Sequence, residues 1–197
     1  MICMSEAEEI SRKQKQVSIS EFFEKNKHFL GFDTLQRSII TAVKESVDNS
    51  LDACEEARIL PDIRVEIQRT QNDELKLITQ DNGPGIPRDA IENVFGKFLL
   101  GSRFHAIRQT RGQQGIGITG VVMYSQLTTG SKTNVVSKIK KDSSAVIVEL
   151  GIDTKKNKAI KTGERREAWI DGLTSKEVVQ GLRIETVMKA KYQRGKK

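Results

Sequence analysis

Residues 45–53 read ESVDNSLDA and lie in the longest helical pattern of the sequence, which covers residues 34–57. Apolar residues recur in this pattern at steps of three and four, which predicts an amphipathic helix. They are Ile39, Val43, Val47, Leu51 and Cys54. Glu45, Asn49 and Asp52 follow one another at steps of four and three, so they share a face roughly opposite the apolar residues.

The polar face of this helix has two interpretations. A carboxylate such as Glu45 can take a proton from an attacking water, and an amide oxygen such as that of Asn49 can ligate Mg²⁺, which prefers hard oxygen ligands. From the spacing alone, a solvated polar face is the simpler alternative. Asp48 and Ser50 are poor helix formers, which indicates that something other than helix propensity selected them.

A second motif, DNGPG at residues 81–85, follows a predicted strand. Gly83 and Gly85 permit positive φ and a close approach of the backbone to a ligand. Asp81, at the mouth of the turn, can accept a hydrogen bond from the exocyclic amino group of adenine. The alternative is an ordinary turn from strand to helix, for which Asp-Asn-Gly is already suited.

A third motif, RGQQGIGI at residues 111–118, leads into a helix predicted over residues 113–125. Free backbone N–H groups at a helix N-terminus, beside glycines that add no bulk, form a phosphate site. The spacing Gly-x-x-Gly-x-Gly differs from the Walker and dinucleotide patterns, and GSKT at residues 130–133 only resembles a Walker end. A flexible glycine-capped loop is the alternative, but the order of all three motifs favours a common function.

The remaining pattern predicts a short helix from residue 18, another opened by Pro87, a long loop over residues 96–111 and a polar loop over residues 155–163. Strands are expected at residues 63–68, 75–80, 134–140, 145–150, 166–170 and 182–188. This order lacks the regular βαβ alternation of a parallel sheet. It predicts an α/β fold of the α+β kind: a two-layer sandwich with a mixed, mostly antiparallel sheet and helices on one face.

The composition restricts the class of protein. The 197 residues suit one globular domain, and no run of about 18 apolar residues predicts a membrane span. Two cysteines, Cys3 and Cys54, are too few for a disulfide framework or a metal cluster, so we expect reduced thiols in a cytosolic protein. The formal net charge of +7 is compatible with a role near nucleic acid or with solvated loops.

The order of the three motifs resembles the GHKL superfamily, which includes gyrase-type topoisomerases, heat-shock chaperones, mismatch-repair ATPases and sensor histidine kinases. Residues 45–53 most resemble the B-subunit family of the type II DNA topoisomerase VI. So do VFGKFLLGS at residues 94–102, residues 111–117 and YSQLTTG at residues 124–130. The resemblance is dense over residues 18–137, and it implies the Bergerat fold of an ATP-binding domain.

The resemblance also implies residue roles. Glu45 would be the general base that deprotonates water against the γ-phosphate, and Asn49 would ligate Mg²⁺. Asp81 would bind the adenine amino group, with Gly83 and Gly85 shaping the pocket. Further contacts to ATP would come from a lid and from a phosphate cradle. The lid holds Ser102 and Arg103, and the cradle comprises Gly112, Gln113, Gln114, Gly115, Ile116, Gly117, Ile118 and Thr119.

The implied protein uses ATP to dimerise and hydrolyses it to power DNA strand passage by a complex with the topoisomerase VI A subunit. Residues 1–32 would be a mobile strap that reaches the second protomer, residues 33–190 the ATP-binding domain and residues 191–197 a basic tail. The expected partners are the A subunit, DNA and a second copy, with no membrane. The expected location is cytoplasmic and nucleoid-associated, or nuclear in a eukaryote.

Two departures from the family pattern carry expectations of their own. Several members have Gly-Thr near the last strand, where this sequence has Gly181-Leu182, so a polar contact to adenine is lost. Complete B subunits also continue into a transducer domain that supplies a lysine to the γ-phosphate, so the domain alone is expected to turn over slowly. The alternatives are a nucleotide-gated dimerisation or adaptor module with little hydrolysis, and another GHKL ATPase of the chaperone or mismatch-repair type.

Overall fold

The computed structural model describes residues 19–70, 73–96, 117–153 and 158–192. Its helical elements are α2 (Ile19–Leu30), α3 (Leu35–Glu56), the 3₁₀ turn η1 (Arg88–Ala90), α4 (Ile91–Gly96) and α5 (Gly117–Thr129). Its strands are β1 (Ile63–Arg69), β2 (Glu74–Asp81), β3 (Thr133–Lys138), β4 (Ala145–Asp153), β5 (Lys158–Glu167) and β6 (Gly181–Lys189).

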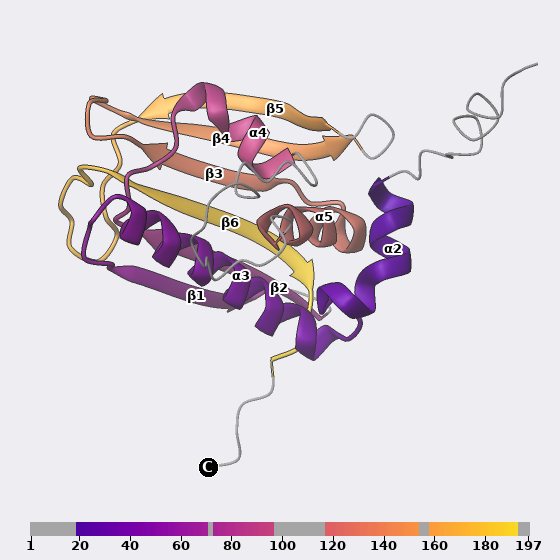
Figure 1. Cartoon of the computed structure of the whole chain (residues 1–197). Coiled ribbons are helices and arrows are strands. Elements are labelled where there is room, and N and C mark those ends of the chain that lie inside the picture. The colour runs from indigo at the N-terminus through magenta and orange to yellow at the C-terminus, as the bar shows by residue number, and fades with distance from the viewer. Residues whose placement is uncertain (1–18, 71–72, 97–116, 154–157, 193–197) are drawn as a thin grey trace, which may run out of the picture.

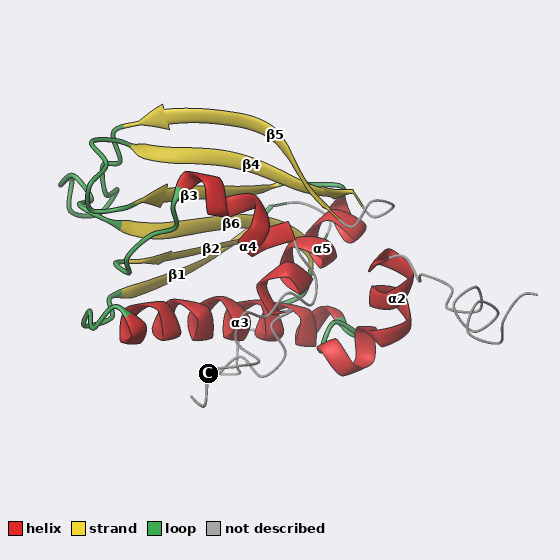
Figure 2. Cartoon of the chain, turned by 45° about the horizontal axis from the view of Figure 1, so that its top comes forward, coloured by secondary structure: helices red, strands yellow, loops and turns green. Residues whose placement is uncertain are grey.

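The strands form one six-stranded sheet in the order β1-β2-β6-β3-β4-β5. Each neighbouring pair recorded among the described residues is antiparallel. The helices lie together on one side of this sheet (Figures 1 and 2). The predicted two-layer α/β sandwich with a mostly antiparallel sheet is therefore confirmed. The last strand, β6, lies between β2 and β3, so it joins the two halves of the sheet.

Small side chains form the buried line of α3. Thr34 caps the helix by accepting a hydrogen bond from the backbone N–H of Arg37 at 3.2 Å. The buried positions that recur every four residues are Ser38, Ala42, Ser46, Ser50 and Cys54. Of the five apolar residues expected on the buried face, Ile39 and Cys54 are buried. Val43, Val47 and Leu51 are only half-buried. Small side chains allow the helix to lie close to β2, which brings polar groups of both elements within hydrogen-bonding distance.

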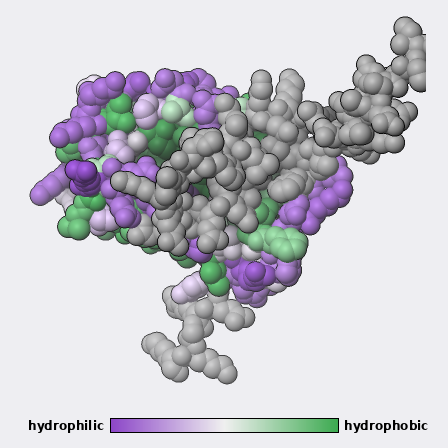
Figure 3. All heavy atoms as spheres, in the orientation of Figure 1, coloured by the Kyte–Doolittle hydropathy of each residue, from purple (hydrophilic) through white to green (hydrophobic). Residues whose placement is uncertain are grey.

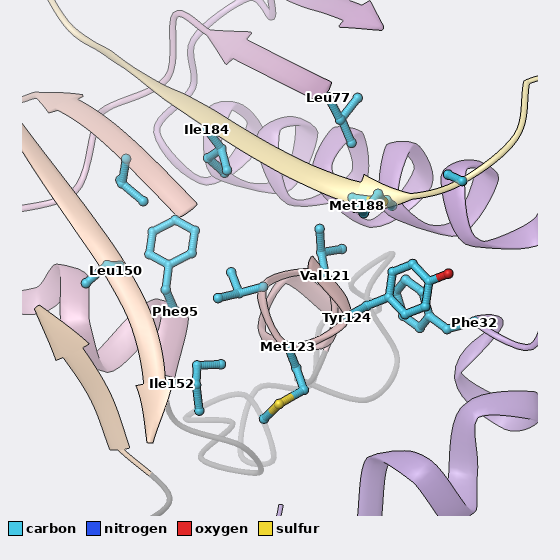
Figure 4. Packing of buried hydrophobic residues seen from close by; sticks show 14 of the residues in the cluster. Phe32, Leu77, Phe95, Val121, Met123, Tyr124, Leu150, Ile152, Ile184 and Met188 are labelled. Carbon is cyan, nitrogen blue, oxygen red and sulfur yellow. The ribbon is translucent and has the colours of Figure 1, made fainter. Parts of the chain in front are cut away.

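Helix α5 forms the centre of the core. Figure 4 shows its side chains pointing in different directions, with Val121 toward Met188 on β6 and Tyr124 toward Phe32. A helix that is apolar on all sides is stable only when it is buried on all sides. The rings of Phe32 and Tyr124 stack with centroids 4.8 Å apart, and Phe23 of α2 lies 5.6 Å from Phe32. Part of the segment expected to be a mobile strap thus packs into the domain core.

Two predictions about local structure were wrong. The polar loop expected over residues 155–163 is largely strand β5, which begins at Lys158, and the strand expected over residues 166–170 ends at Glu167. The physical reason is that β5 is an edge strand, and exposed charged side chains protect such an edge from pairing with other chains. Figure 3 shows hydrophilic residues along this edge, the upper one in Figure 1. Helix α5 also continues to Thr129, four residues beyond its predicted end at 125.

Candidate functional site

The carboxylate of Asp81 connects the end of β2 to the middle of α3. Its Oδ2 accepts a hydrogen bond from the Ser50 hydroxyl at 2.7 Å, and its Oδ1 accepts one from the backbone N–H of Gly83 at 2.9 Å. The residue is only 5% exposed. Burial raises the pKa of Asp81 above its ordinary value, and the hydrogen bonds from Ser50 and Gly83 oppose that rise. The first and second motifs therefore meet at this carboxylate.

The turn after Asp81 is packed so closely that its glycines are required. A Cβ added at Gly85, where φ is +71°, would overlap the carbonyl group of Lys138. A Cβ at Gly83 would come within 2.9 Å of Asp81 Oδ1. The Ser137 hydroxyl accepts from the N–H of Ile86 at 2.7 Å and donates to its carbonyl oxygen at 2.8 Å, which fixes the far side of the turn to β3.

Glu45 lies against the described start of α5. A Cβ added at Gly117 would overlap Oε2 of the Glu45 carboxylate, so only glycine leaves room for that group. The Glu45 side chain keeps 22% of its surface exposed, and Nζ of Lys44 lies 3.6 Å from its Oε1. Hydrogen bonding to Asp48 and the charge of Glu45 raise the pKa of Lys44. The first and third motifs thus meet at Glu45, about 7.5 Å along the α3 axis from Ser50.

Asn49 lies one turn after Glu45 on α3. Its side-chain nitrogen donates to the backbone oxygen of Glu45 at 2.6 Å. This bond orients the amide and leaves its side-chain oxygen to accept a hydrogen bond or to ligate a cation. Asp52, the third residue of the polar face, is 5% exposed. The alternative of a solvated polar face is therefore wrong for Asp52, whereas Glu45 and Asn49 are half-buried.

The predicted site residues divide into three groups. Glu45, Asn49, Asp81, Gly83, Gly85 and Gly117 lie along α3 and the elements that touch it. Ile118 packs against the core and Thr119 is 1% exposed, so neither presents a free side chain. Ser102, Arg103 and residues 112–116 lie outside the described residues.

The register of the sheet places Leu182 of the last strand beside Asp81. Leu182 is the partner of Asp81 across β2 and β6. Gly181 has φ of +148°, and a Cβ there would overlap the backbone oxygen of Asp81. Leu182 packs against the core cluster with its apolar side chain. An apolar residue thus lies directly beside the buried carboxylate.

Sequence reasoning missed several residues of this site. Ser50 was noted only as a poor helix former, and its partner Asp81 lies 31 residues away in the chain. Ser137, Asp171 and Gln180 were not singled out, although all three connect to the turn at residues 81–86 or to the strand before it. Asp171-Gly172 is a turn signal that could have indicated the bend, but not its partners.

A model of the family described as "Histidine kinase-, DNA gyrase B-, and HSP90-like ATPase" matches residues 34–154. The match covers more than half of the chain, and the matched segment contains all three motifs. The chain therefore belongs to this ATPase family.

Within the family, the chain is similar to proteins named as B subunits of type 2 DNA topoisomerase 6. It is 50% identical to the one from Methanococcoides burtonii over 191 residues, which cover 97% of this chain and 30% of that protein. It is 50% identical to the one from Archaeoglobus fulgidus over 95% of this chain and 30% of that protein. The Halobacterium salinarum protein is 56% identical over 77% of this chain and 19% of its own length. The chain thus spans about 30% of the first two of these relatives.

Two further features concern membranes and metals. Among the described residues, no helix has both the length and the apolar character that crossing a membrane demands. In the same residues, no group of three or more His, Cys, Asp or Glu side chains is arranged to hold a metal ion.

Cys54 is a free, buried cysteine. Burial is the main cause that raises the pKa of its thiol, and the charge of Asp81 adds to it.

Proposed function

We propose that this chain binds and hydrolyses ATP as the ATPase domain of a topoisomerase VI B subunit. The observation that carries the proposal is the convergence of the three motifs on α3. Ser50 holds Asp81 at 2.7 Å, and Glu45 fits against Gly117 at the described start of α5. Residues that are up to 72 positions apart in the chain are brought into one site, as a nucleotide extended along α3 would require.

The adenine would be bound at the Asp81 end of the site. A carboxylate has about four lone-pair positions, and Ser50, Gly83 and the backbone of Leu182 occupy three of them. The remaining position can accept from the exocyclic amino group of adenine. Because the carboxylate is buried, this hydrogen bond is electrostatically stronger than it would be in water.

The phosphates would lie at the Glu45 end. Free N–H groups at the start of α5 and the helix dipole favour negative charge there. The partly exposed carboxylate of Glu45 would accept a proton from the attacking water. Asn49 would hold Mg²⁺ through its side-chain oxygen, together with phosphate oxygens. When bound, the ion would neutralise charge on the phosphates during transfer.

For the whole protein we propose an activity in DNA topology. The similarity to proteins named as B subunits of type 2 DNA topoisomerase 6 supports DNA as the substrate and a partner subunit, and the family resemblance implies dimerisation on ATP. The resemblance also implies that a lysine from a transducer domain completes the phosphate end of the site. We therefore expect nucleotide binding with slow hydrolysis when the chain is tested alone.

Titration calorimetry with a non-hydrolysable ATP analogue and Mg²⁺ tests the adenine end. Wild-type protein should show saturable binding, and Asp81→Asn should weaken it because the amide has only one acceptor atom and presents a donor in place of the second oxygen. Asp89→Asn changes an exposed aspartate in η1 and should leave the affinity unchanged. Absence of binding by folded wild-type protein would contradict the proposal.

The rate of ATP hydrolysis by the Glu45→Ala variant tests the phosphate end of the site. The variant should bind the analogue as wild type does and lose hydrolysis by about 10²–10⁴-fold, the usual contribution of a general base. Glu56→Ala, on the same helix, is the matched control. A nucleotide-gated adaptor with little hydrolysis would show the same residual rate in both variants and in wild type.

A further inference from the structure

The segment of residues 168–180 connects β5 to β6 and folds back on itself. The N–H of Val178 donates to the oxygen of Trp169 at 2.8 Å, and Ile170 forms a β-bridge with Glu177. The segment lies beside the end of β2 and the beginning of β1, at the left of Figure 1. It is therefore a small hairpin next to the turn that holds Asp81.

Asp171 fixes this hairpin to the sheet. Its Oδ2 accepts from Nη1 of Arg64 on β1 and from Nε2 of Gln80 on β2, each at 3.0 Å. Its Oδ1 accepts from the backbone N–H groups of Leu173 at 3.0 Å and Thr174 at 2.8 Å. These donors, with the Thr174 hydrogen bond first and Arg64 next, hold the pKa of Asp171 well below its usual range. The hairpin is thus anchored by a carboxylate whose ionised form these donors favour.

Gln180, at the end of the hairpin, reaches the turn itself. Its side-chain Nε2 donates to the backbone oxygens of Asn82 at 3.4 Å and of Gly83 at 3.2 Å. The Asn82 oxygen belongs to the same peptide group as the Gly83 N–H, which donates to Asp81 Oδ1 at 2.9 Å. Because a peptide group is planar, Gln180 and the Asp81 carboxylate hold the two ends of one rigid unit.

We propose that Gln180 is a positioning residue for base recognition, which orients the Asn82–Gly83 peptide and through it the Asp81 carboxylate that binds adenine. The inference rests on the proposed nucleotide site and adds a residue to it. The opposite side of the turn is fixed independently, because the Asn82 side chain donates to the oxygen of Leu60 at 3.0 Å and accepts from the N–H of Asp62 at 2.8 Å. Without Gln180, the Asn82–Gly83 peptide loses the hydrogen bond to its oxygen. The Gly83 N–H is then no longer held in a fixed position to donate to the Asp81 carboxylate.

The consequence is specific to the base. Adenine presents an amino group to Asp81, and guanine presents an oxygen at the same ring position. A well-placed carboxylate therefore favours adenine, whereas the phosphate contacts are common to both nucleotides. Displacing the carboxylate should weaken ATP binding and leave the weaker binding of GTP nearly unchanged. A general loss of stability would not change the preference between two nucleotides in this way.

The test compares wild type with Gln180→Leu, which removes the donor, and with Gln180→Glu, which places carboxylate oxygens against two carbonyl oxygens. Dissociation constants are measured for non-hydrolysable ATP and GTP analogues with Mg²⁺. Both variants should lower the preference for the ATP analogue by about tenfold, the factor that corresponds to one hydrogen bond. The rate of hydrolysis at saturating ATP should stay close to that of wild type. Gln68→Leu, on the exposed face of β1, is the matched control.

Hydrogen exchange of the Gly83 amide tests the inference without nucleotide. In Gln180→Leu that amide should exchange faster, while amides in the middle of β2 keep their protection. Unchanged Gly83 exchange, or an unchanged preference between the two analogues, would overturn the role of Gln180. If wild type binds neither analogue, the proposed nucleotide site fails, and with it the premise of this inference; unaltered binding in the variants alone would leave the proposed function intact.

Discussion

At the scale of single residues, the proposed contact of Asp81 with adenine places two opposing requirements on this side chain. Its carboxylate would be buried, to exclude water from the base, and ionised, to accept strongly from an amino group. Burial raises its pKa, and the hydroxyl of Ser50 and the N–H of Gly83 partly reverse that effect. The hydrogen bond from Ser50 therefore lowers the pKa of the carboxylate relative to burial alone.

The pH dependence of binding follows from this pKa. Nucleotide affinity should be full above the raised pKa of Asp81 and should fall as the pH decreases through it, because a proton then occupies the acceptor. Replacing Ser50 with alanine removes a hydrogen bond that stabilises the charged form, so the loss of affinity should begin at a higher pH. Titrations of the ATP analogue between pH 8 and pH 5 measure the shift.

The folded state has the opposite pH dependence. Since the pKa of Asp81 is higher in the folded than in the unfolded chain, the folded chain binds more protons between the two values. The contribution of Asp81 to stability therefore falls as the pH rises through that range.

The control for the binding titrations is Ser38→Ala. Ser38 is a buried serine on the same helix that donates to Thr34, so this variant should not move the pH midpoint of nucleotide binding. Superimposable curves for Ser50→Ala and wild type would contradict the assignment.

At the scale of elements, the packing of α3 determines the site. Its buried line of small residues allows β2 to approach from one side, and Gly117 allows α5 to approach Glu45 from another. Both contacts depend on residues that are small where a helix of average composition would be large. The site is thus a product of how closely three elements pack.

Replacing Gly117 with alanine should disturb the packing around Glu45 and leave the stability of the domain nearly unchanged. The added Cβ would overlap Oε2 of Glu45, the end of a flexible side chain, so the carboxylate should turn away while the backbone stays in place. Alanine is also the better helix former by about 1 kcal/mol, so the free energy of unfolding should change little. Hydrolysis should fall by roughly 10²-fold or more, because the base is displaced.

A double-mutant comparison checks that the effect passes through Glu45. In the Glu45→Ala background, adding Gly117→Ala should not reduce hydrolysis further, since residues that act as a unit are not additive. Gly172→Ala, where an added Cβ meets nothing within 4 Å, should behave as wild type. A normal rate of hydrolysis in Gly117→Ala would show that Glu45 does not act from the observed position.

The sequence predicted some elements well and others poorly, for physical reasons. The strong periodicity of residues 34–57 and the apolar content of β2, β4 and β6 made these elements evident. Strand β5 was missed because its exposed edge is charged, as in residues 164–167, and charge on an edge strand resembles a loop. The position of β6 between β2 and β3 depends on tertiary packing, which no local pattern records.

The candidate site likewise contains residues that the sequence indicated and residues that it did not. Its motif residues Glu45, Asn49 and Asp81 could be named from spacing, because their chemistry is visible in the residue types. The supporting groups Ser50 and Gln180 could not, because serine and glutamine have no distinctive pattern and their partners are distant in sequence. The sequence placed Gly181-Leu182 near the last strand, and the register adds that Leu182 is paired with Asp81.

At the scale of the whole molecule, strand β6 joins the site to the core. It is the last strand in the chain, yet it pairs with both β2 and β3. Its first residues lie beside Asp81, and Met188 near its other end is fully buried against α5. Because β6 belongs both to the site and to the core, a ligand that binds the site should stabilise the whole domain.

This coupling predicts how stability responds to nucleotide. With an ATP analogue at 100 times its dissociation constant, the free energy of unfolding should rise by about 2.7 kcal/mol. Met188→Ala removes fully buried volume and should lower that free energy by about 2–5 kcal/mol, but the increment from nucleotide should remain, because Met188 lies at the far end of β6 from Asp81. In Asp81→Asn, by contrast, the increase in unfolding free energy caused by the analogue should be smaller at the same analogue concentration.

Denaturant unfolding of the three proteins, with and without the analogue and Mg²⁺, measures these quantities. A two-state domain gives one transition in each case, so the increments can be compared directly. If Met188→Ala lost the increment as well, the site would depend on core packing at its far end, and α5 would have to shift when nucleotide binds. If Asp81→Asn kept the full increment, the analogue would be held by its phosphates alone, and the assignment of the adenine end to Asp81 would be wrong.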